Sequence, residues 1–204
     1  MKNLRSTARV AGALAGIALV ASTGAAAQAA GDRTHPAYVA ADVSFMSGMI
    51  HHHAQAVLMA GWAPTHEASP SLRALCERIV VGQRDEIALM QRWLQDRHES
   101  IPDPAHDRMP GMERLVMMPG MVTAEQLVQL DQARGPEFDR LFLRFMIQHH
   151  QGAITMVNQL FGSHGGGEEE TVFRFASDVY ADQSTEIDRM RKMLAALLFN
   201  EPGQ

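Results

Sequence analysis

Cysteine is almost absent from this chain of 204 residues, since Cys76 is the only one. A single cysteine excludes an intramolecular disulfide. Cys76 lies in an apolar stretch with helical spacing, so we expect a buried and unreactive thiol. The chain also lacks a positive balance of charge, because its formal net charge at pH 7 is −5. An acidic chain is a poor partner for nucleic acid or an anionic membrane surface, and both are excluded as targets.

Several enzyme motifs are missing as well. The chain has no Glu-x-x-His of a di-iron bundle, no His-Glu-x-x-His of a zinc protease and no Gly-x-Ser-x-Gly of a hydrolase. It also lacks a sustained alternation of apolar and polar residues, whereas apolar residues recur at helical intervals. The sequence therefore predicts an all-α protein that is not an enzyme.

The first residues, 1 to about 30, have the pattern of a secretory signal peptide. An apolar segment (10–21) follows three basic residues, and Ala27-Gln28-Ala29 fits a cleavage site. The apolar segment is too short for a transmembrane helix, which needs about 20 apolar residues. The basic residues are Lys2, Arg5 and Arg9, and their removal would change the net charge from −5 to −8. We expect a periplasmic or secreted protein without membrane insertion after cleavage.

One segment of the chain occurs twice, at an offset of 97 residues. Met-Ile-x-His-His begins at Met49 and again at Met146, and in both copies an alanine and then a methionine follow at intervals of three. A second motif, Gln-x-x-Glu-Ile-x-x-Met-x-x-x-Leu, begins at Gln83 and recurs at Gln183. Each half therefore predicts a helical hairpin. Two hairpins bury their apolar stripes most simply against each other, as a four-helix bundle.

We expect a single domain over residues 37–198 of the mature chain. It consists of a first hairpin (37–97), a linker rich in Met, Pro and Gly (98–137) and a second hairpin (138–198).

Local signals predict where some of the helices begin and end. Asp42 is the expected N-cap of the first helix, which Gly61 ends. Within the linker, Thr123 and Gln126 form a capping box that opens a short helix to about residue 133.

Methionine and histidine share one face of each repeated helix. Residues three and four apart on a helix are neighbours, so Met49 lies beside both His52 and His53. The side chains of adjacent histidines point about 100° apart on a helix. Both can therefore face the interior of one helix bundle only at the edges of that interior. We expect one histidine of each pair to ligate a metal while the other hydrogen-bonds a neighbouring helix. The candidate ligands on these helices are Met49, His52, His53, Met59, Met146, His149, His150 and Met156.

A purely structural role for the histidines is the alternative. In that case Gln83, Glu86, Gln183 and Glu186 would be their hydrogen-bond partners and would orient the imidazole rings.

The linker adds a second group of methionines in Met-Pro-Gly-Met stretches. Thioethers in loops bury little apolar surface, and clustered thioethers bind Cu(I) or Ag(I) rather than Zn(II), Mg(II) or Ca(II). The alternatives are a flexible linker or an interaction surface. The candidate ligands of the linker are Met109, Met112, Met117, Met118 and Met121. We expect the histidines outside the two repeated motifs to be solvated loop residues: His35, His66, His98, His106 and His164.

The combined pattern resembles the domain of unknown function 305 family over about residues 37 to 198. Phe-x-x-x-Met-Ile-x-His-His-x-x-Ala followed by Gln-x-x-Glu-Ile-x-x-Met is duplicated around a Met-Pro-Gly-Met linker. The resemblance implies an exported, ferritin-like helical protein, and members of the CopM type are periplasmic copper-binding proteins. It also implies Cu(I) or Ag(I) binding, and it adds Met90 and Met190 to the candidate ligands of the helices.

The first copy is not identical to the second. His51 stands where the second copy has Gln148, and Gly48 where it has Phe145. We expect an exported Cu(I) or Ag(I) chaperone or buffer in copper tolerance. It would have no organic cofactor, and its partner would be another copper-handling protein of the cell envelope. The alternative function is a helical interaction module of the envelope that binds no metal and whose His/Gln/Glu network is structural.

Overall fold

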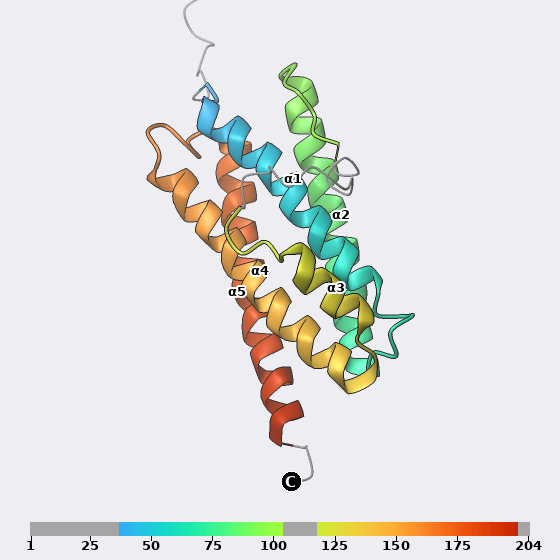
Figure 1. Cartoon of the computed structure of the whole chain (residues 1–204). Coiled ribbons are helices and arrows are strands. Elements are labelled where there is room, and N and C mark those ends of the chain that lie inside the picture. The colour runs from blue at the N-terminus through green and yellow to red at the C-terminus, as the bar shows by residue number, and fades with distance from the viewer. Residues whose placement is uncertain (1–36, 104–117, 200–204) are drawn as a thin grey trace, which may run out of the picture. The chain divides into compact units, whose positions relative to one another are not determined.

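The computed structural model describes residues 37–103 and 118–199, and the expected signal peptide lies outside them. The described residues form five α-helices and no strand, which confirms the all-α prediction for this part of the chain. The helices are α1 (Ala40–Gly61), α2 (Pro70–Asp96), α3 (Ala124–Gln132), α4 (Gly135–Gly162) and α5 (Glu170–Phe199) (Figure 1).

The long helices form two antiparallel pairs. Helix α1 packs along α2, and α4 packs along α5, while α1 and α4 cross and join the two pairs (Figure 1). The short helix α3 lies against α4. Buried apolar side chains form two clusters. The Phe45 cluster joins the first half of α1 to the second half of α4, and the Phe138 cluster joins the second half of α1 to the first half of α4.

A buried carboxylate on each crossing helix holds the loop of the opposite pair. Asp42 accepts a hydrogen bond from the backbone N–H of Gly167, between α4 and α5, at 2.7 Å. Asp139 accepts from the N–H of Ser69, between α1 and α2, at 3.2 Å. The prediction of Asp42 as N-cap is wrong, since α1 begins at Ala40 after the N-cap Val39. Asp42 lies in the first turn of the helix, where its carboxylate also accepts a hydrogen bond from the N–H of the N-cap Val39 at 2.9 Å.

Other helix ends lie at or near the residues that the sequence predicts. The capping box of α3 is confirmed, because Gln126 N donates to Thr123 Oγ1 and Thr123 N donates to Gln126 Oε1. Helix α1 ends at Gly61 as expected. Helix α4 begins at Gly135, before the expected start of the second hairpin, with a proline in its first turn, where proline costs no helical hydrogen bond.

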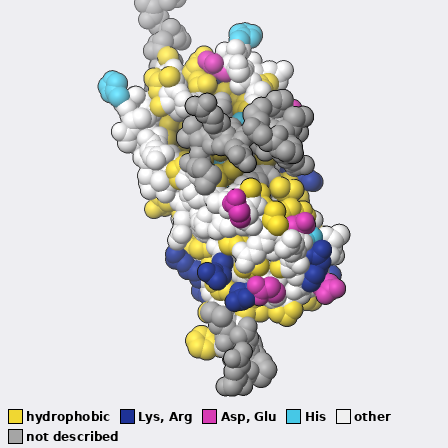
Figure 2. Space-filling model, in the orientation of Figure 1, with side chains coloured by type: hydrophobic (Ala, Val, Ile, Leu, Met, Phe, Trp, Pro, Cys, Tyr) yellow, Lys and Arg dark blue, Asp and Glu magenta, His cyan; other side chains and the backbone are white. Residues whose placement is uncertain are grey.

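The surface is mixed in character. On the face shown in Figure 2, Lys and Arg side chains gather toward the end at which α5 finishes. Single large apolar side chains such as Val81 and Phe173 are exposed. None of the described helices has the length and apolarity needed to cross a membrane.

Candidate metal centre

A layer of polar side chains separates the two apolar clusters. On α1 the cluster residues stop at Ile50 and resume at Ala56, and on α4 they stop at Met146 and resume at Ala153. The same interruption occurs on α2 and α5, where the repeated Gln and Glu residues stand. We call these side chains the polar layer: His52, His53, Gln83, Glu86, His149, His150, Gln183 and Glu186. The four histidines and both glutamines are buried.

His52 and His149 face each other where α1 crosses α4. Their ring centroids are 3.8 Å apart, and both side chains are fully buried. The Nε2 atom of His52 lies 3.0 Å from the carbonyl oxygen of Pro119. A carbonyl only accepts, so Nε2 carries the proton and Nδ1 presents a lone pair. Among the described residues, His52 Nδ1 and both ring nitrogens of His149 have no hydrogen-bond partner.

His53 and His150 instead point to the outer helices. His53 Nε2 lies 2.7 Å from Glu86 Oε2 on α2, and His150 Nε2 lies at the same distance from Glu186 Oε2 on α5. One histidine of each pair thus contacts a neighbouring helix, in the way the sequence predicts. The expectation that both histidines reach the interior only at its edges is wrong. Packed against α2 and α5, His53 and His150 are as fully buried as their neighbours.

Burial keeps the imidazoles of His52, His149 and His150 neutral. It lowers the pKa of His52 to about 3, and the nearby His53 adds to the effect. It lowers the pKa of His149 well below its usual value, with neighbouring histidines adding to the shift. The pKa of His150 is also lowered by burial, although the carboxylate of Glu186 opposes the change. Neutral imidazole is the form that ligates a metal, so these side chains are ready to bind one at pH 7.

Carboxylates gather where the polar layer meets solvent. Glu86 and Glu186 are about a quarter exposed, at 23% and 24%. Burial raises the pKa of Asp182, and the charges of Glu86 and Glu186 raise it further. The two glutamates, one from α2 and one from α5, therefore both lie near Asp182.

The predicted methionine ligands of the helices are divided between the two apolar clusters. All six are buried, and each cluster draws methionines from both hairpins. The Phe45 cluster holds Met49, Met90 and Met156, and the Phe138 cluster holds Met59, Met146 and Met190. Among residues 37–103 and 118–199, no group of three or more His, Cys, Asp or Glu side chains has a geometry that could hold a metal ion.

The linker methionines are only partly described. Met118 and Met121 are half-buried, and Met118 packs against the Phe45 cluster. The predicted ligands Met109, Met112 and Met117 lie outside the described residues, as do His35 and His106.

His66 differs from its sequence-based expectation. We expect it to be solvated, yet it is buried, with Nε2 2.9 Å from the carbonyl oxygen of Asp131 and Nδ1 3.0 Å from that of Trp62. Its ring also stacks on Trp62. The sequence offered only one signal for this role, the aromatic residue four positions earlier. His98 and His164 are exposed, as expected.

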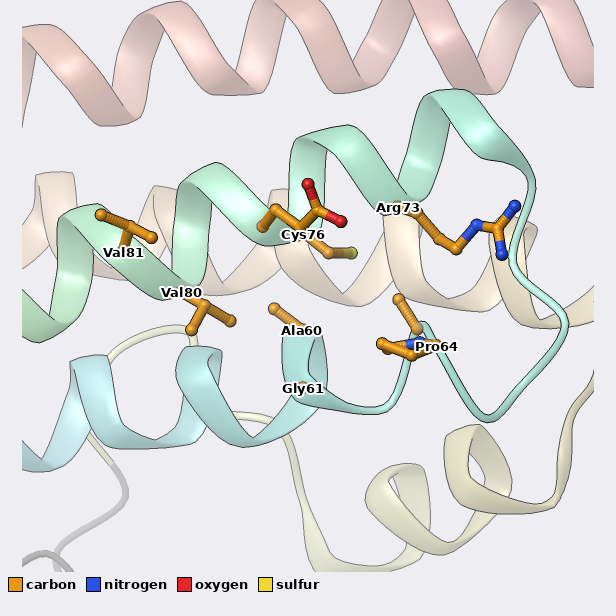
Figure 3. A pocket seen from close by; sticks show the side chains of 9 residues that line it. Ala60, Gly61, Pro64, Arg73, Cys76, Val80 and Val81 are labelled. Carbon is orange, nitrogen blue, oxygen red and sulfur yellow. The ribbon is translucent and has the colours of Figure 1, made fainter.

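Cys76 lies apart from the polar layer, beside a pocket between the end of α1 and the start of α2. The pocket has a volume of about 260 Å³, and Cys76 lines it together with apolar residues such as Ala60 and Val80 (Figure 3). Burial raises the pKa of the Cys76 thiol, with the charge of Asp139 adding to the shift. The prediction of a buried thiol is confirmed, and a thiol with a raised pKa is a poor nucleophile and ligand.

Comparison with known proteins identifies the family. The family model described as Domain of unknown function (DUF305) matches residues 42–194, which is most of the chain. The chain belongs to the DUF305 family. No curated protein is significantly similar to it.

Solved structures of DUF305 proteins and of CopM are similar to this chain. A DUF305 protein from Streptomyces coelicolor is 27% identical, with a TM-score of 0.65 over 80% of this chain and 98% of its own. A DUF305 fragment from Deinococcus radiodurans is 27% identical, with a TM-score of 0.66 over 79% and 99%. CopM in its Cu(II)-bound form is 30% identical, with a TM-score of 0.62 over 76% and 96%. CopM has also been solved with Cu(I) and with Ag.

Proposed function

We propose that this DUF305 protein is an exported protein that binds Cu(I) or Ag(I) and acts as a metal chaperone or buffer in copper tolerance. The observation that carries the proposal is the His52–His149 pair. Both rings are fully buried, and three of their four nitrogens lack a hydrogen-bond partner among the described residues. An unpartnered buried polar group costs about 1–3 kcal/mol, and a metal ion bound to the lone pair offsets that cost.

The surrounding donors favour a soft, monovalent ion. Buried methionines lie on both sides of the polar layer, and thioethers bind Cu(I) in preference to harder ions. Imidazole is a good ligand for copper as well. The structural similarity to CopM, which has been solved with Cu(I), Cu(II) and Ag, supports the same choice.

We further infer a ferritin-like four-helix bundle made of two repeated hairpins, 37–97 and 138–198, joined by the linker 98–137. The support is a set of equivalent contacts. Asp42 and Asp139, at an offset of 97 residues, each hold the loop of the opposite hairpin. The two His–Glu contacts, at the same 2.7 Å, are likewise related by the offsets of the two sequence motifs.

Export is proposed from the signal-peptide pattern of residues 1–30. The Streptomyces coelicolor protein is named as a presumed secreted protein, which supports the same location. We propose a carrier that catalyses no reaction, and a copper-handling protein of the cell envelope as its partner.

A helical interaction module without metal is the second candidate function. The His53–Glu86 and His150–Glu186 contacts favour it, because they give two of the four histidines a structural role. Buried methionine is also an ordinary core residue.

Competition between the protein and a chromophoric Cu(I) chelator under anaerobic conditions separates the two functions. We expect His52→Asn and His149→Asn to weaken Cu(I) binding by at least about tenfold, because loss of even an outer partner of a ligand costs 10- to 100-fold. His164→Asn changes an exposed histidine and is the matched control, with wild-type affinity expected. Failure of the wild-type protein to compete for Cu(I) would favour the interaction module, whereas wild-type affinity in both polar-layer variants, together with native circular dichroism, would exclude the His52–His149 pair as the metal site.

A further inference from the structure

The end of the linker forms a strap over the crossing of α1 and α4. We define the strap as residues 118–122; Figure 1 shows it running toward α3 across these helices. The carbonyl of Pro119 lies 3.0 Å from His52 Nε2. The side chain of Gln55 donates to Val122 O at 2.9 Å and accepts from Val122 N at 2.8 Å. The strap is therefore fixed to α1 at both of its ends.

On α4 the strap lies directly against the helix backbone. A Cβ atom at Gly152 would lie 1.9 Å from the carbonyl oxygen of Pro119, which no side chain tolerates. Gly120 has a φ of 76°, and a Cβ atom there would lie 2.6 Å from Gly152 Cα. The side chain of Gln148 also lies within 3.4 Å of the carbonyl oxygen of Gly120. Only glycine at position 152 permits this approach of two backbones.

The two sequence copies differ at the positions that contact the strap. Gln55 on α1, which holds Val122, corresponds to Gly152 on α4, which makes room for Pro119. Gly48 on α1 corresponds to Phe145 on α4, a buried residue of the Phe138 cluster. The repeat is therefore asymmetric at the strap.

Two methionine side chains end near Gly48. A Cβ atom placed on Gly48 would lie 3.4 Å from Met118 Sδ, on the strap, and 3.4 Å from Met156 Cε, on α4. The ends of both methionine side chains therefore lie over the same residue of α1, one from the strap and one from α4. Met156 is almost fully buried, whereas Met118 is half-buried, so an ion can approach from the strap side.

We propose that Met118 and Met156, brought together over Gly48 by the strap, form a two-thioether site for Cu(I) or Ag(I). The inference rests on the proposed function and locates one of its sites. Thioethers are uncharged and carry no proton, so the site takes a soft monovalent cation and discriminates against Zn(II), Mg(II) and Ca(II). Because its donors come from the strap and from α4, the site is made once, although the His-containing helix occurs twice.

Titration with Ag(I), followed through the ¹³C-labelled methyl groups of the methionines by NMR, tests the site. Ag(I) is a diamagnetic and air-stable probe of Cu(I) sites. We expect the methyl resonances of Met118 and Met156 to shift in parallel when the first equivalent of Ag(I) is added. Met118→Leu and Met156→Leu preserve side-chain volume and should each weaken Ag(I) binding by at least about tenfold, as loss of a ligand requires.

Two further variants sharpen the test. Gly48→Phe places the residue of the second copy over the site and should weaken Ag(I) binding while both methionines remain. Met46→Leu changes a fully buried methionine of the same cluster and should bind Ag(I) like the wild type.

The outcomes separate this inference from the proposed function. If the first equivalent shifts other methionine methyls or histidine resonances, and Met118→Leu and Met156→Leu bind as tightly as the wild type, the site is wrong while metal binding stands. If Ag(I) shifts no methionine and no histidine resonance, both the site and the proposed function are overturned.

Discussion

Acidification should destabilise the metal-free protein through its buried histidines. Burial sets the pKa of His52 at about 3, against 6.5 for an ordinary histidine. The unfolded chain therefore binds the proton first. The contribution of neutral His52 to the free energy of unfolding is therefore fully present above about pH 6.5, and it is lost as the pH falls toward the pKa of His52 in the folded protein. Between pH 6.5 and pH 5, His52 alone should lower the free energy of unfolding by about 2 kcal/mol. The pKa values of His149 and His150 are shifted in the same direction.

Urea unfolding at pH 7 and pH 5, followed by circular dichroism in the presence of a metal chelator, measures the effect. A loss of about 2 kcal/mol lowers the urea midpoint by about 1 M when the slope is about 2 kcal/mol per M. His52→Gln has no titrating group at this position and should lose less stability over the same interval, whereas the exposed-site control His164→Gln should lose as much as the wild type. A midpoint that is constant or rises between pH 7 and pH 5 would refute the reasoning, as would equal losses in His52→Gln and the wild type.

Two further substitutions, each with a comparison variant, test the contacts that position the centre, and all are measured by urea unfolding at pH 7. Asp42→Ala removes the acceptor of Gly167 N and should lower the free energy of unfolding by about 1–3 kcal/mol, whereas the exposed Asp188→Ala should change it by less than about 0.5 kcal/mol. Gly152→Ala drives a methyl group into the strap and should cost about 1–3 kcal/mol. Gly82→Ala, in a helix with nothing within 4 Å of the new Cβ, should stabilise by about 1 kcal/mol. Equal effects of Asp42→Ala and Asp188→Ala, or of the two glycine variants, would contradict the described packing.

The helices were predictable because their signals are local. Glycine and proline at the ends of α1 and α4, and the Thr123–Gln126 capping box, act over a few residues of the chain. The contact between His53 and Glu86 was also accessible, since both residues belong to repeated motifs on neighbouring helices. Repetition supplied information that a single motif lacks.

Long-range packing set the limits of prediction. Aspartate is a residue type that favours the N-cap position, but the carboxylate of Asp42 also accepts a hydrogen bond from Gly167, which is far away in the sequence. His66 is buried by contacts with Trp62 and Asp131, and the second of these comes from another helix. No local pattern distinguishes such a histidine from a solvated one.

The position of the strap was equally hidden in the sequence. Gly48 and Gly152 appear there only as departures from the repeat. Their meaning becomes visible once Met118 and Pro119 are seen lying against them. A position at which two copies of a repeat differ can therefore mark the place where a segment outside the repeat packs.

Metal binding is the central claim, and anaerobic equilibrium dialysis of the purified protein against Cu(I), followed by metal analysis, tests it most directly. We predict that bound copper reaches a plateau at a small whole number of ions per chain. The thermal unfolding midpoint should rise in parallel, because a ligand that binds only the folded state stabilises it. Copper that dialyses away completely, with an unchanged midpoint at saturating Cu(I), would contradict the account.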